Sequence, residues 1–145
     1  HDTLAYNYRM DGIQGAVLRV KLRHLGKWTE LRRLRASQYE AKLSPFGISR
    51  ASEVSGRRHV YHVYSIFHSE RDKLQDALKD SGIHTGKHYP IPIHLQKPYR
   101  YLAYGEGDFP VSERVAREQL SLPLFPELKE EDVNRVSDAV CNWLG

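Results

Sequence analysis

The sequence predicts an α/β domain of a small, α+β-like kind, in which a long N-terminal helix precedes a short three-stranded sheet, mainly antiparallel or mixed, backed by helices. The first observation is a stretch without proline from residue 11 to residue 43. The second is that strand-like and helix-like segments alternate after it, an order typical of a sheet with helices packed on it. The third is size, since 145 residues with 40% hydrophobic and 28% charged side chains suit one globular domain.

Residues 11 to 43 predict one long amphipathic helix with a bend near Gly26. Its apolar residues recur at helical spacing and are Ile13, Val17, Val20, Leu25, Trp28 and Leu31. The segment after it, "SPFGISRASEVSGRR" at residues 44 to 58, is rich in Ser, Gly and Pro. That composition predicts a loop.

Residues 59 to 67, "HVYHVYSIF", predict a strand covered on both sides, because β-branched and aromatic residues occupy both alternating faces. A helix from residue 70 to residue 81 follows. Ser69 and Asp72 have the spacing of a capping box at its start, and Gly82 closes it. Residues 83 to 89 predict the second strand.

The rest of the chain predicts a helix over residues 109 to 120, a short third strand over 120 to 125 and a final helix over 130 to 144. The final helix carries acidic residues in its first turn, where the helix dipole favours negative charge. The single cysteine, Cys141, falls in its apolar pattern, so neither a disulfide nor a cysteine metal site is available.

The formal net charge of +4 is concentrated in one segment, since seven of the basic residues lie between residues 19 and 35. Such a cluster would suit nucleic-acid phosphates, but aromatic residues do not interleave with it as on a stacking platform. We interpret it as a solvated helix face and expect no nucleic-acid partner. No apolar run approaches the ~20 residues of a membrane span, and no signal peptide opens the chain. We therefore expect a cytoplasmic protein without a membrane contact.

The stretch "HTGKHYPIPIHLQ", residues 84 to 96, is the strongest candidate for a binding site. Pro90 and Pro92 restrict their own φ and push the residues before them towards extended conformations. His88 and Tyr89 would thereby be held in place, and their donors and acceptors suit a ligand rich in hydroxyl groups. The alternative is that both residues cap a strand and the prolines merely end it. His94 fits either interpretation equally.

The histidines of this stretch do not predict a metal site. His84 and His88 lie four residues apart in the expected strand. At ~3.3 Å per residue their side chains would be about 13 Å apart, too far to share one ion.

Three motifs in one order resemble a known family. They are "YNYRMDGIQGAV", then "GIHTGKHYPIPIHLQKPYRYL", then "FPVSERVAREQLSLPLFPELKEEDV". They look like the C-terminal part of the sugar aminotransferases of the DegT/DnrJ/EryC1/StrS family. The resemblance implies a pyridoxal 5'-phosphate (PLP) enzyme of fold type I. It also implies that residues 1–43 form an interdomain helix with a dimer-facing N-terminal segment, that residues 44–145 form the small C-terminal domain, and that the large PLP-binding domain lies outside this chain.

The resemblance also implies roles for individual residues. Asn7 takes the position that reaches the PLP phosphate of the neighbouring subunit in a homodimer with shared active sites, and Arg9 lies on the nucleotide-sugar side. His88 and Tyr89, with His94 after them, face the sugar substrate. Without the resemblance, Asn7 would be interpreted as a turn former and Arg9 as part of a surface ion pair, for example with Asp11.

No lysine of this chain lies in the family's Schiff-base motif, so the chain contains no catalytic residue of its own and is expected to be inactive alone. The resemblance implies that the full-length enzyme transfers an amino group, usually from glutamate, to a nucleotide-linked keto-sugar. The "TGKHYPIPIHLQ" stretch favours a 3-keto sugar. The abrupt start at His1 suggests a fragment. The alternative is a non-catalytic dimerisation or protein-binding module, because the apolar stripe of the first helix would be left exposed.

Overall fold

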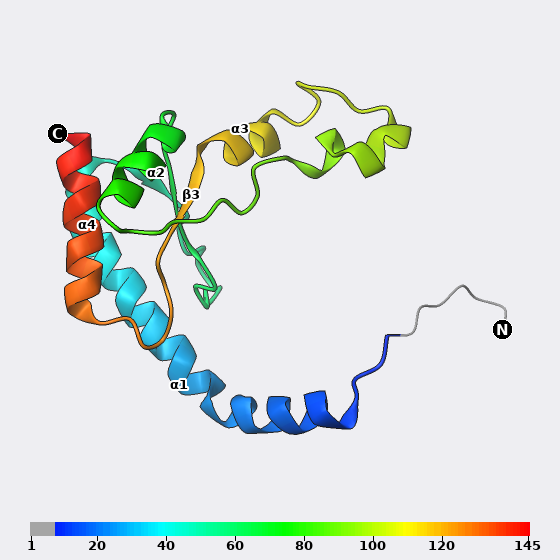
Figure 1. Ribbon diagram of the computed structural model, residues 1–145, viewed down its shortest axis with the longest axis vertical. Helices are drawn as coiled ribbons and strands as arrows, with labels where there is room; N and C mark the ends of the chain where they lie inside the picture. The colour runs from blue at the N-terminus through cyan, green and yellow to red at the C-terminus, as the bar shows by residue number, and fades with distance from the viewer. Residues whose placement is uncertain (1–7) are drawn as a thin grey trace, which may run out of the picture.

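The computed structural model describes residues 8–145, and Asn7 lies outside them. Four α-helices and one three-stranded sheet make up the regular structure of these residues (Figure 1). The helices are α1 (Gly12–Leu43), α2 (Arg71–Asp80), α3 (Pro110–Glu118) and α4 (Glu130–Leu144), and the strands are β1 (Ser49–Arg50), β2 (Tyr64–Phe67) and β3 (Gln119–Leu122). Short 3-10 turns are η1 (Ser44–Phe46), η2 (Ile93–Leu95) and η3 (Lys97–Leu102).

Helix α1 confirms the long helix that the sequence predicted. Asp11 caps it reciprocally with Gln14: the Gln14 N–H donates to Asp11 Oδ1 at 2.7 Å, and the Asp11 N–H donates to Gln14 Oε1 at 3.2 Å. These two bonds satisfy donors that a helix start leaves without partners. The helix then runs for 32 residues, and its axis changes direction between the blue and cyan ends in Figure 1.

The sheet has the order β1-β2-β3 with both pairs antiparallel. This confirms the predicted three-stranded, mainly antiparallel sheet, although one of its strands was missed and one predicted strand does not form. Strand β1 lies within the segment predicted as a loop. It was missed because only two residues pair and the local composition carries no strand signal. Residues 83 to 89 are not a strand. They contribute one bridge, Gly86 to Ser121. Two residues after Gly86, the His88 N–H donates to the Gln119 side chain instead of a strand backbone.

Strand β2 is shorter than predicted, and side chains explain why. Tyr61 has a positive φ of 48°, and its N–H donates to the His59 ring. The carbonyl of His59 accepts from Arg33 on α1 at 2.6 Å. These local bonds compete with strand pairing, so the ladder begins only at Tyr64.

The helix boundaries after β2 also need small corrections. Helix α2 lacks the predicted capping box, since its N-cap is Glu70 without a side-chain cap bond, and Asp72 binds Arg71 and Lys87 instead. Helix α3 begins with Pro110 at its first position, which proline favours. It ends at Glu118, and the chain enters β3 directly. Helix α4 has the predicted bounds.

The core lies between the sheet, α2, α4 and the C-terminal part of α1, which together we call the body. Tyr39 of α1 is fully buried, stacks on Tyr64 of β2 with ring centroids 4.9 Å apart, and donates its hydroxyl to the Pro123 carbonyl at 2.9 Å. In β3, Leu120 and Leu122 join this core. Gln119 and Ser121 alternate with them and are also buried, so one short strand has a covered apolar face and a covered polar face.

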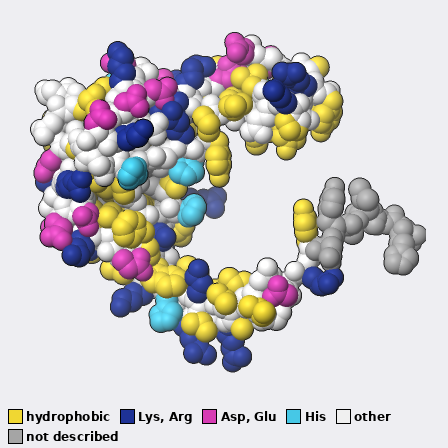
Figure 2. All heavy atoms as spheres, in the orientation of Figure 1, with side chains coloured by type: hydrophobic (Ala, Val, Ile, Leu, Met, Phe, Trp, Pro, Cys, Tyr) yellow, Lys and Arg dark blue, Asp and Glu magenta, His cyan; other side chains and the backbone are white. Residues whose placement is uncertain are grey.

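Two arms project from the body and leave a hollow between them (Figures 1 and 2). One arm is the N-terminal part of α1, where Ile13, Val17 and Val20 are exposed. The other is residues 84–109, which we call the proline loop. None of the described helices is both long and apolar enough to cross a membrane.

Candidate functional site

The proline loop starts from the sheet at the Gly86 bridge. The Gly86 N–H donates to the Ser121 carbonyl at 3.0 Å, and the Ser121 N–H donates back at 2.7 Å. Two residues later the His88 N–H donates to Gln119 Oε1 at 2.7 Å. Strand β3 therefore fixes the beginning of the loop through both its backbone and its side chains.

His88 and Tyr89 differ in how firmly the contacts with β3 hold their side chains. The His88 ring lies with Nδ1 2.9 Å from Ser121 Oγ, so its position is fixed. The Tyr89 ring meets the His88 ring edge to face, with centroids 5.6 Å apart, yet 74% of Tyr89 is exposed. One residue of the pair is held and the other is presented to solvent, which is the arrangement expected of a recognition loop.

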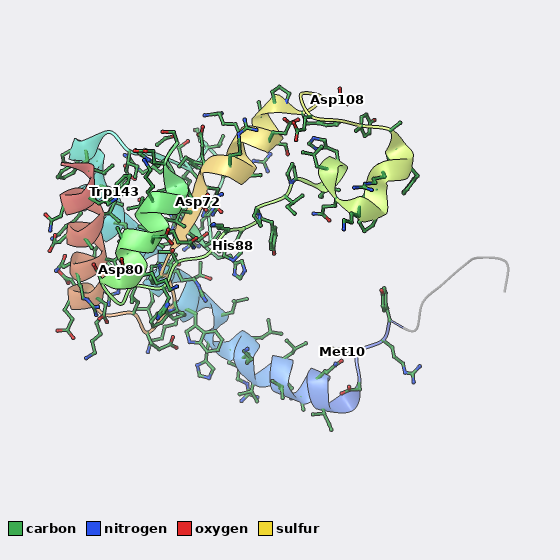
Figure 3. All side chains as sticks on the ribbon, turned by 45° about the horizontal axis from the view of Figure 1, so that its top comes forward. Met10, Asp72, Asp80, His88, Asp108 and Trp143 are labelled. Atoms are coloured by element: carbon green, nitrogen blue, oxygen red, sulfur yellow. The ribbon has the colours of Figure 1, made fainter. Side chains whose placement is uncertain are left out.

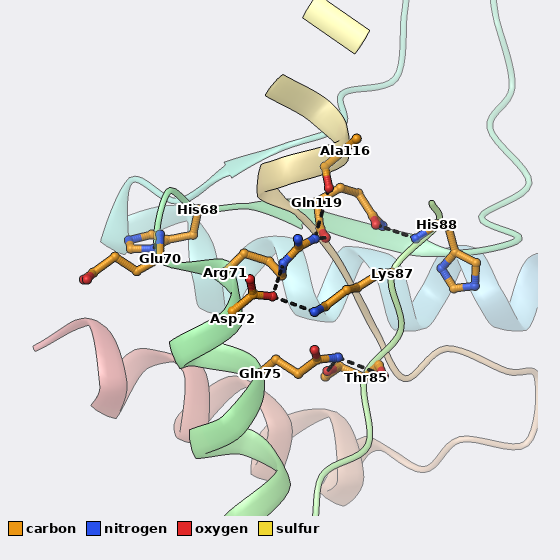
Figure 4. A network of polar contacts seen from close by, with 10 residues as sticks. All are labelled: His68, Glu70, Arg71, Asp72, Gln75, Thr85, Lys87, His88, Ala116 and Gln119. Atoms are coloured by element: carbon orange, nitrogen blue, oxygen red, sulfur yellow. Dashed lines mark hydrogen bonds and ion pairs between the residues drawn. The ribbon is translucent and has the colours of Figure 1, made fainter. Parts of the chain in front are cut away.

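An ionic cluster supports the same segment from the side of α2 (Figure 4). Lys87 Nζ lies 2.6 Å from Asp72 Oδ1, and Arg71 Nε lies 2.7 Å from the same oxygen. The Lys87 hydrogen bond is the largest cause that lowers the pKa of Asp72. Arg71 is buried and donates to the carbonyls of Ala116 and Gln119. The lysine nearest His88 is thus engaged in a structural contact.

His94 lies at the far side of the loop and is only 8% exposed. Its Nε2 is 3.1 Å from Glu113 Oε1, and its ring lies 4.8 Å from the Phe109 ring. The ring is covered, so any influence of His94 on a ligand would act through the shape of the loop. The structure therefore separates His94 from the presented Tyr89.

Glu113 is a buried acid that the sequence analysis did not single out. Besides His94, its carboxylate accepts from the N–H groups of Gly107 at 2.9 Å and Phe109 at 3.2 Å. Burial would raise the pKa of Glu113, but the bonds from Phe109, Gly107 and His94 outweigh it and hold the pKa below its ordinary value. The sequence did contain a signal for Glu113, because it is an acidic residue in the first turn of a helix that begins with proline.

The remaining candidates lie on the other arm. Arg9 is exposed in the stretch before α1, and the Asp11 carboxylate, offered as its partner, caps the helix. Met10, next to Arg9, and His88 lie on different arms (Figure 3). One chain therefore does not bring Arg9 together with His88. Among residues 8–145, no three His, Cys, Asp or Glu side chains are grouped to hold a metal ion.

Part of the basic cluster is used within the chain. Arg33 forms two bonds with Glu53, and Arg35 donates to the Leu128 carbonyl at 2.5 Å. These residues join α1 to neighbouring loops, so their charges have a structural use.

Residues 1–141 match the model of the DegT/DnrJ/EryC1/StrS aminotransferase family. The chain belongs to this family. The resemblance drawn from three motifs is thereby confirmed, and the family's members are PLP-dependent aminotransferases. Lys87, the lysine next to His88 in the sequence, is paired with Asp72.

Several relatives carry informative names. The chain is 44% identical to the pleiotropic regulatory protein of Geobacillus stearothermophilus, over 99% of this chain and 39% of that protein. It is 38% identical to the dTDP-3-amino-3,4,6-trideoxy-alpha-D-glucose transaminase of Streptomyces venezuelae, over 99% of this chain and 38% of that protein. It is 36% identical to the UDP-N-acetyl-3-dehydro-alpha-D-glucosamine 3-aminotransferase of Acidithiobacillus ferrooxidans, over 97% and 37%. The chain thus spans less than two fifths of the length of these relatives.

The crystal structure of S. venezuelae DesV in complex with a ketimine intermediate superposes with a TM-score of 0.94 at 38% identity, covering 99% of this chain and 39% of that one. The match is to the C-terminal part of the PLP aminotransferase fold. The predicted fold, a small C-terminal domain with its long N-terminal helix, is therefore confirmed.

Proposed function

We propose that this chain is the C-terminal portion of a PLP-dependent nucleotide-sugar aminotransferase, which transfers an amino group from glutamate to a keto-sugar. Family membership supports the reaction class. The observation that carries the sugar-binding role is the pair at the loop start: His88 is fixed on β3 while Tyr89 beside it is 74% exposed. A fixed imidazole next to a presented phenol can hydrogen-bond several sugar hydroxyl groups at little cost in ordering.

The sugar would be a 3-keto sugar. Two relatives, at 38% and 36% identity, are named for a 3-amino sugar and for a 3-dehydro sugar, one with dTDP and one with UDP. The two names share the position of the amino group and differ in the nucleotide. We therefore extend the sugar position to this protein and leave the nucleotide open.

Each part of the chain would have a definite task. Residues 44–145 form the small domain, whose His88 and Tyr89 orient the sugar ring. His94 holds the loop in shape through its bond to Glu113. PLP, when bound, supplies the electron sink for amino transfer, and the lysine that binds it would come from the large domain. The chain alone would be inactive.

Residues 1–43 would serve a homodimer with shared active sites. Because Met10, the neighbour of Arg9, lies on a different arm of the chain from His88 (Figure 3), a second subunit offers a way to bring Arg9 and His88 to one substrate. Arg9 would meet the diphosphate as a planar fork. Asn7, which lies outside the described residues, would donate to the PLP phosphate of the neighbouring subunit, as the family resemblance implies.

The test is to express the complete reading frame with PLP and to follow the visible absorption of the purified protein. We expect a cofactor band that glutamate bleaches and that a 3-keto sugar nucleotide restores. Tyr89→Phe should lower kcat/KM for the sugar about tenfold and leave the reaction with glutamate unchanged. Tyr101→Phe is the matched control, since Tyr101 is 78% exposed on η3. A protein without a band would overturn the proposal.

The second candidate is a non-catalytic dimerisation or protein-binding module. The exposed apolar arm of α1, with Val17, Val20 and Leu25, favours it, because such a surface normally seeks a partner. Concentration-dependent association in sedimentation, without affinity for any nucleotide sugar, would support this module over the enzyme.

A further inference from the structure

The His88 ring lies at the end of a chain of polar groups that crosses the sheet. Gln119 and Ser121 of β3 are 3% and 5% exposed. Ser65, on β2, is paired in register with Ser121. Gln119 reaches both hydroxyl groups, at 2.9 Å from Ser65 Oγ and 2.7 Å from Ser121 Oγ. Buried polar groups are kept in this way only where hydrogen bonds satisfy them.

The backbone N–H of His88 decides which groups donate and which accept in this series of hydrogen bonds. A backbone N–H can only donate, so the Gln119 atom that receives the His88 N–H at 2.7 Å must be the carbonyl oxygen. The other terminal atom of the amide is therefore the nitrogen. It donates to Ser65 Oγ and to Ser121 Oγ.

The same donor and acceptor roles determine which nitrogen of the imidazole carries the proton. Ser121 Oγ accepts the Gln119 N–H, so its own hydrogen is free to donate. Among the described residues, the acceptor recorded next to it is His88 Nδ1 at 2.9 Å. In a neutral imidazole, one ring nitrogen accepts and the other carries the proton. With Nδ1 accepting, the proton lies on Nε2.

Gly86 lies directly against the His88 ring and, together with Ser121, holds it in place. We call this arrangement the seat of the ring. A Cβ added at Gly86 would lie 2.8 Å from His88 Cε1, closer than non-bonded carbon atoms are found in proteins. The φ of Gly86 is not in the left-handed region, so an alanine there would displace the ring without straining the backbone. Two backbone hydrogen bonds also join Gly86 to Ser121. Gly86 and the Ser121 hydroxyl therefore keep a fixed position relative to each other.

We propose that Gln119, Ser121 and Gly86 are positioning residues that hold His88 in the tautomer protonated at Nε2 and direct this N–H to an oxygen acceptor of the sugar. The proposal deepens the proposed function and rests on it for the identity of the ligand. The tautomer itself rests only on the contacts within the chain.

The first measurement is the ring 15N NMR spectrum of His88 in the complete protein labelled at histidine, assigned by its loss in His88→Asn. We expect Nε2 to carry the proton. In Gln119→Glu the side chain can no longer donate, so Ser121 donates to it instead and accepts from His88, and Nδ1 becomes protonated. Ser121→Ala should release the preference, and Ser121→Thr, which keeps the hydroxyl, should retain it. Protonation at Nδ1 in the unaltered protein, or no response to Gln119→Glu, would overturn the proposal.

The second measurement separates this role from general stability. Gly86→Ala should lower kcat/KM for the keto-sugar nucleotide about tenfold or more, while the reaction with glutamate stays within about twofold. Gly105→Ala is the control, because nothing lies within 4 Å of a Cβ added there. Equal kinetics for the two variants would contradict the positioning role. If the tautomer responds as expected but no sugar is aminated, the positioning of His88 stands and the proposed function fails.

Discussion

The body and the proline loop are held by different interactions. The body buries large apolar side chains such as Leu43, Ile66 and Leu74, each with no exposed surface. The proline loop leaves most of its apolar residues exposed and is held at His88 and Glu113 by hydrogen bonds. Apolar burial is non-directional and stabilises the whole fold, whereas hydrogen bonds fix particular atoms. The loop is therefore suited to set geometry, and the body to supply stability.

A cavity in the body should have the largest effect on stability. Leu74 of α2 is fully buried, so Leu74→Ala should lower the free energy of unfolding by about 2–5 kcal/mol. Denaturant unfolding of the complete protein would measure the loss. The NMR tautomer of His88 should not change in the folded fraction. A loss of the loop contacts before global unfolding would show that the loop depends on the core more than its contacts indicate.

Acid should weaken the contacts that Glu113 makes with the proline loop. The pKa of Glu113 is lowered in the folded state, so its contribution is complete above the ordinary carboxyl value of about 4.3. It is lost as pH falls through the lower, folded pKa. The amide resonances of Gly107 and Phe109, which donate to this carboxylate, should report the titration.

Glu113→Gln supplies the control for the acid experiment. The substitution removes the titrating group and keeps an oxygen that accepts hydrogen bonds, so the shifts of the two amides should become independent of pH in this range. A midpoint at or above the ordinary carboxyl value in the unaltered protein would contradict the stabilising role of Glu113.

The smallest effect is expected from the ion pair between the loop and α2. Asp72 is 71% exposed in its side chain, and exposed pairs contribute less than about 1 kcal/mol. Lys87→Met should therefore change the free energy of unfolding by a few tenths of a kcal/mol. Lys42→Met is the comparison, because Lys42 pairs with exposed Asp138 on the body. A clearly larger loss of unfolding free energy for Lys87→Met than for Lys42→Met would contradict this prediction. It would show that the ion pair with Asp72 holds the loop in place.

The sequence predicted the elements whose signal is local and repeated. Helix α1 follows from its long stretch without proline and helix α4 from its apolar periodicity, and their bounds agreed within a residue. The two-residue β1 and the Gly86 bridge depend on partners far along the chain, which no local pattern contains. For the same reason a strand was wrongly expected over residues 83 to 89.

The sequence pointed to the exposed part of the candidate site but not to the residues that support it. The prolines and the ordered motifs drew attention to His88 and Tyr89. Nothing in the spacing connected His88 to Gln119, which lies 31 residues further along, or His94 to Glu113. Supports of this kind appear only when the fold brings two segments together.

Strand β3 limits how the length of this chain can change. Its side chains alternate between the core, through Leu120 and Leu122, and the seat of His88, through Gln119 and Ser121. Helix α3 joins the strand with no intervening residue. Inserting or deleting one residue at this junction would exchange the two faces at once, burying the polar groups in the core and turning leucine towards the imidazole. We therefore expect length changes at residues 118 to 119 to disturb the fold more than substitutions along the proline loop.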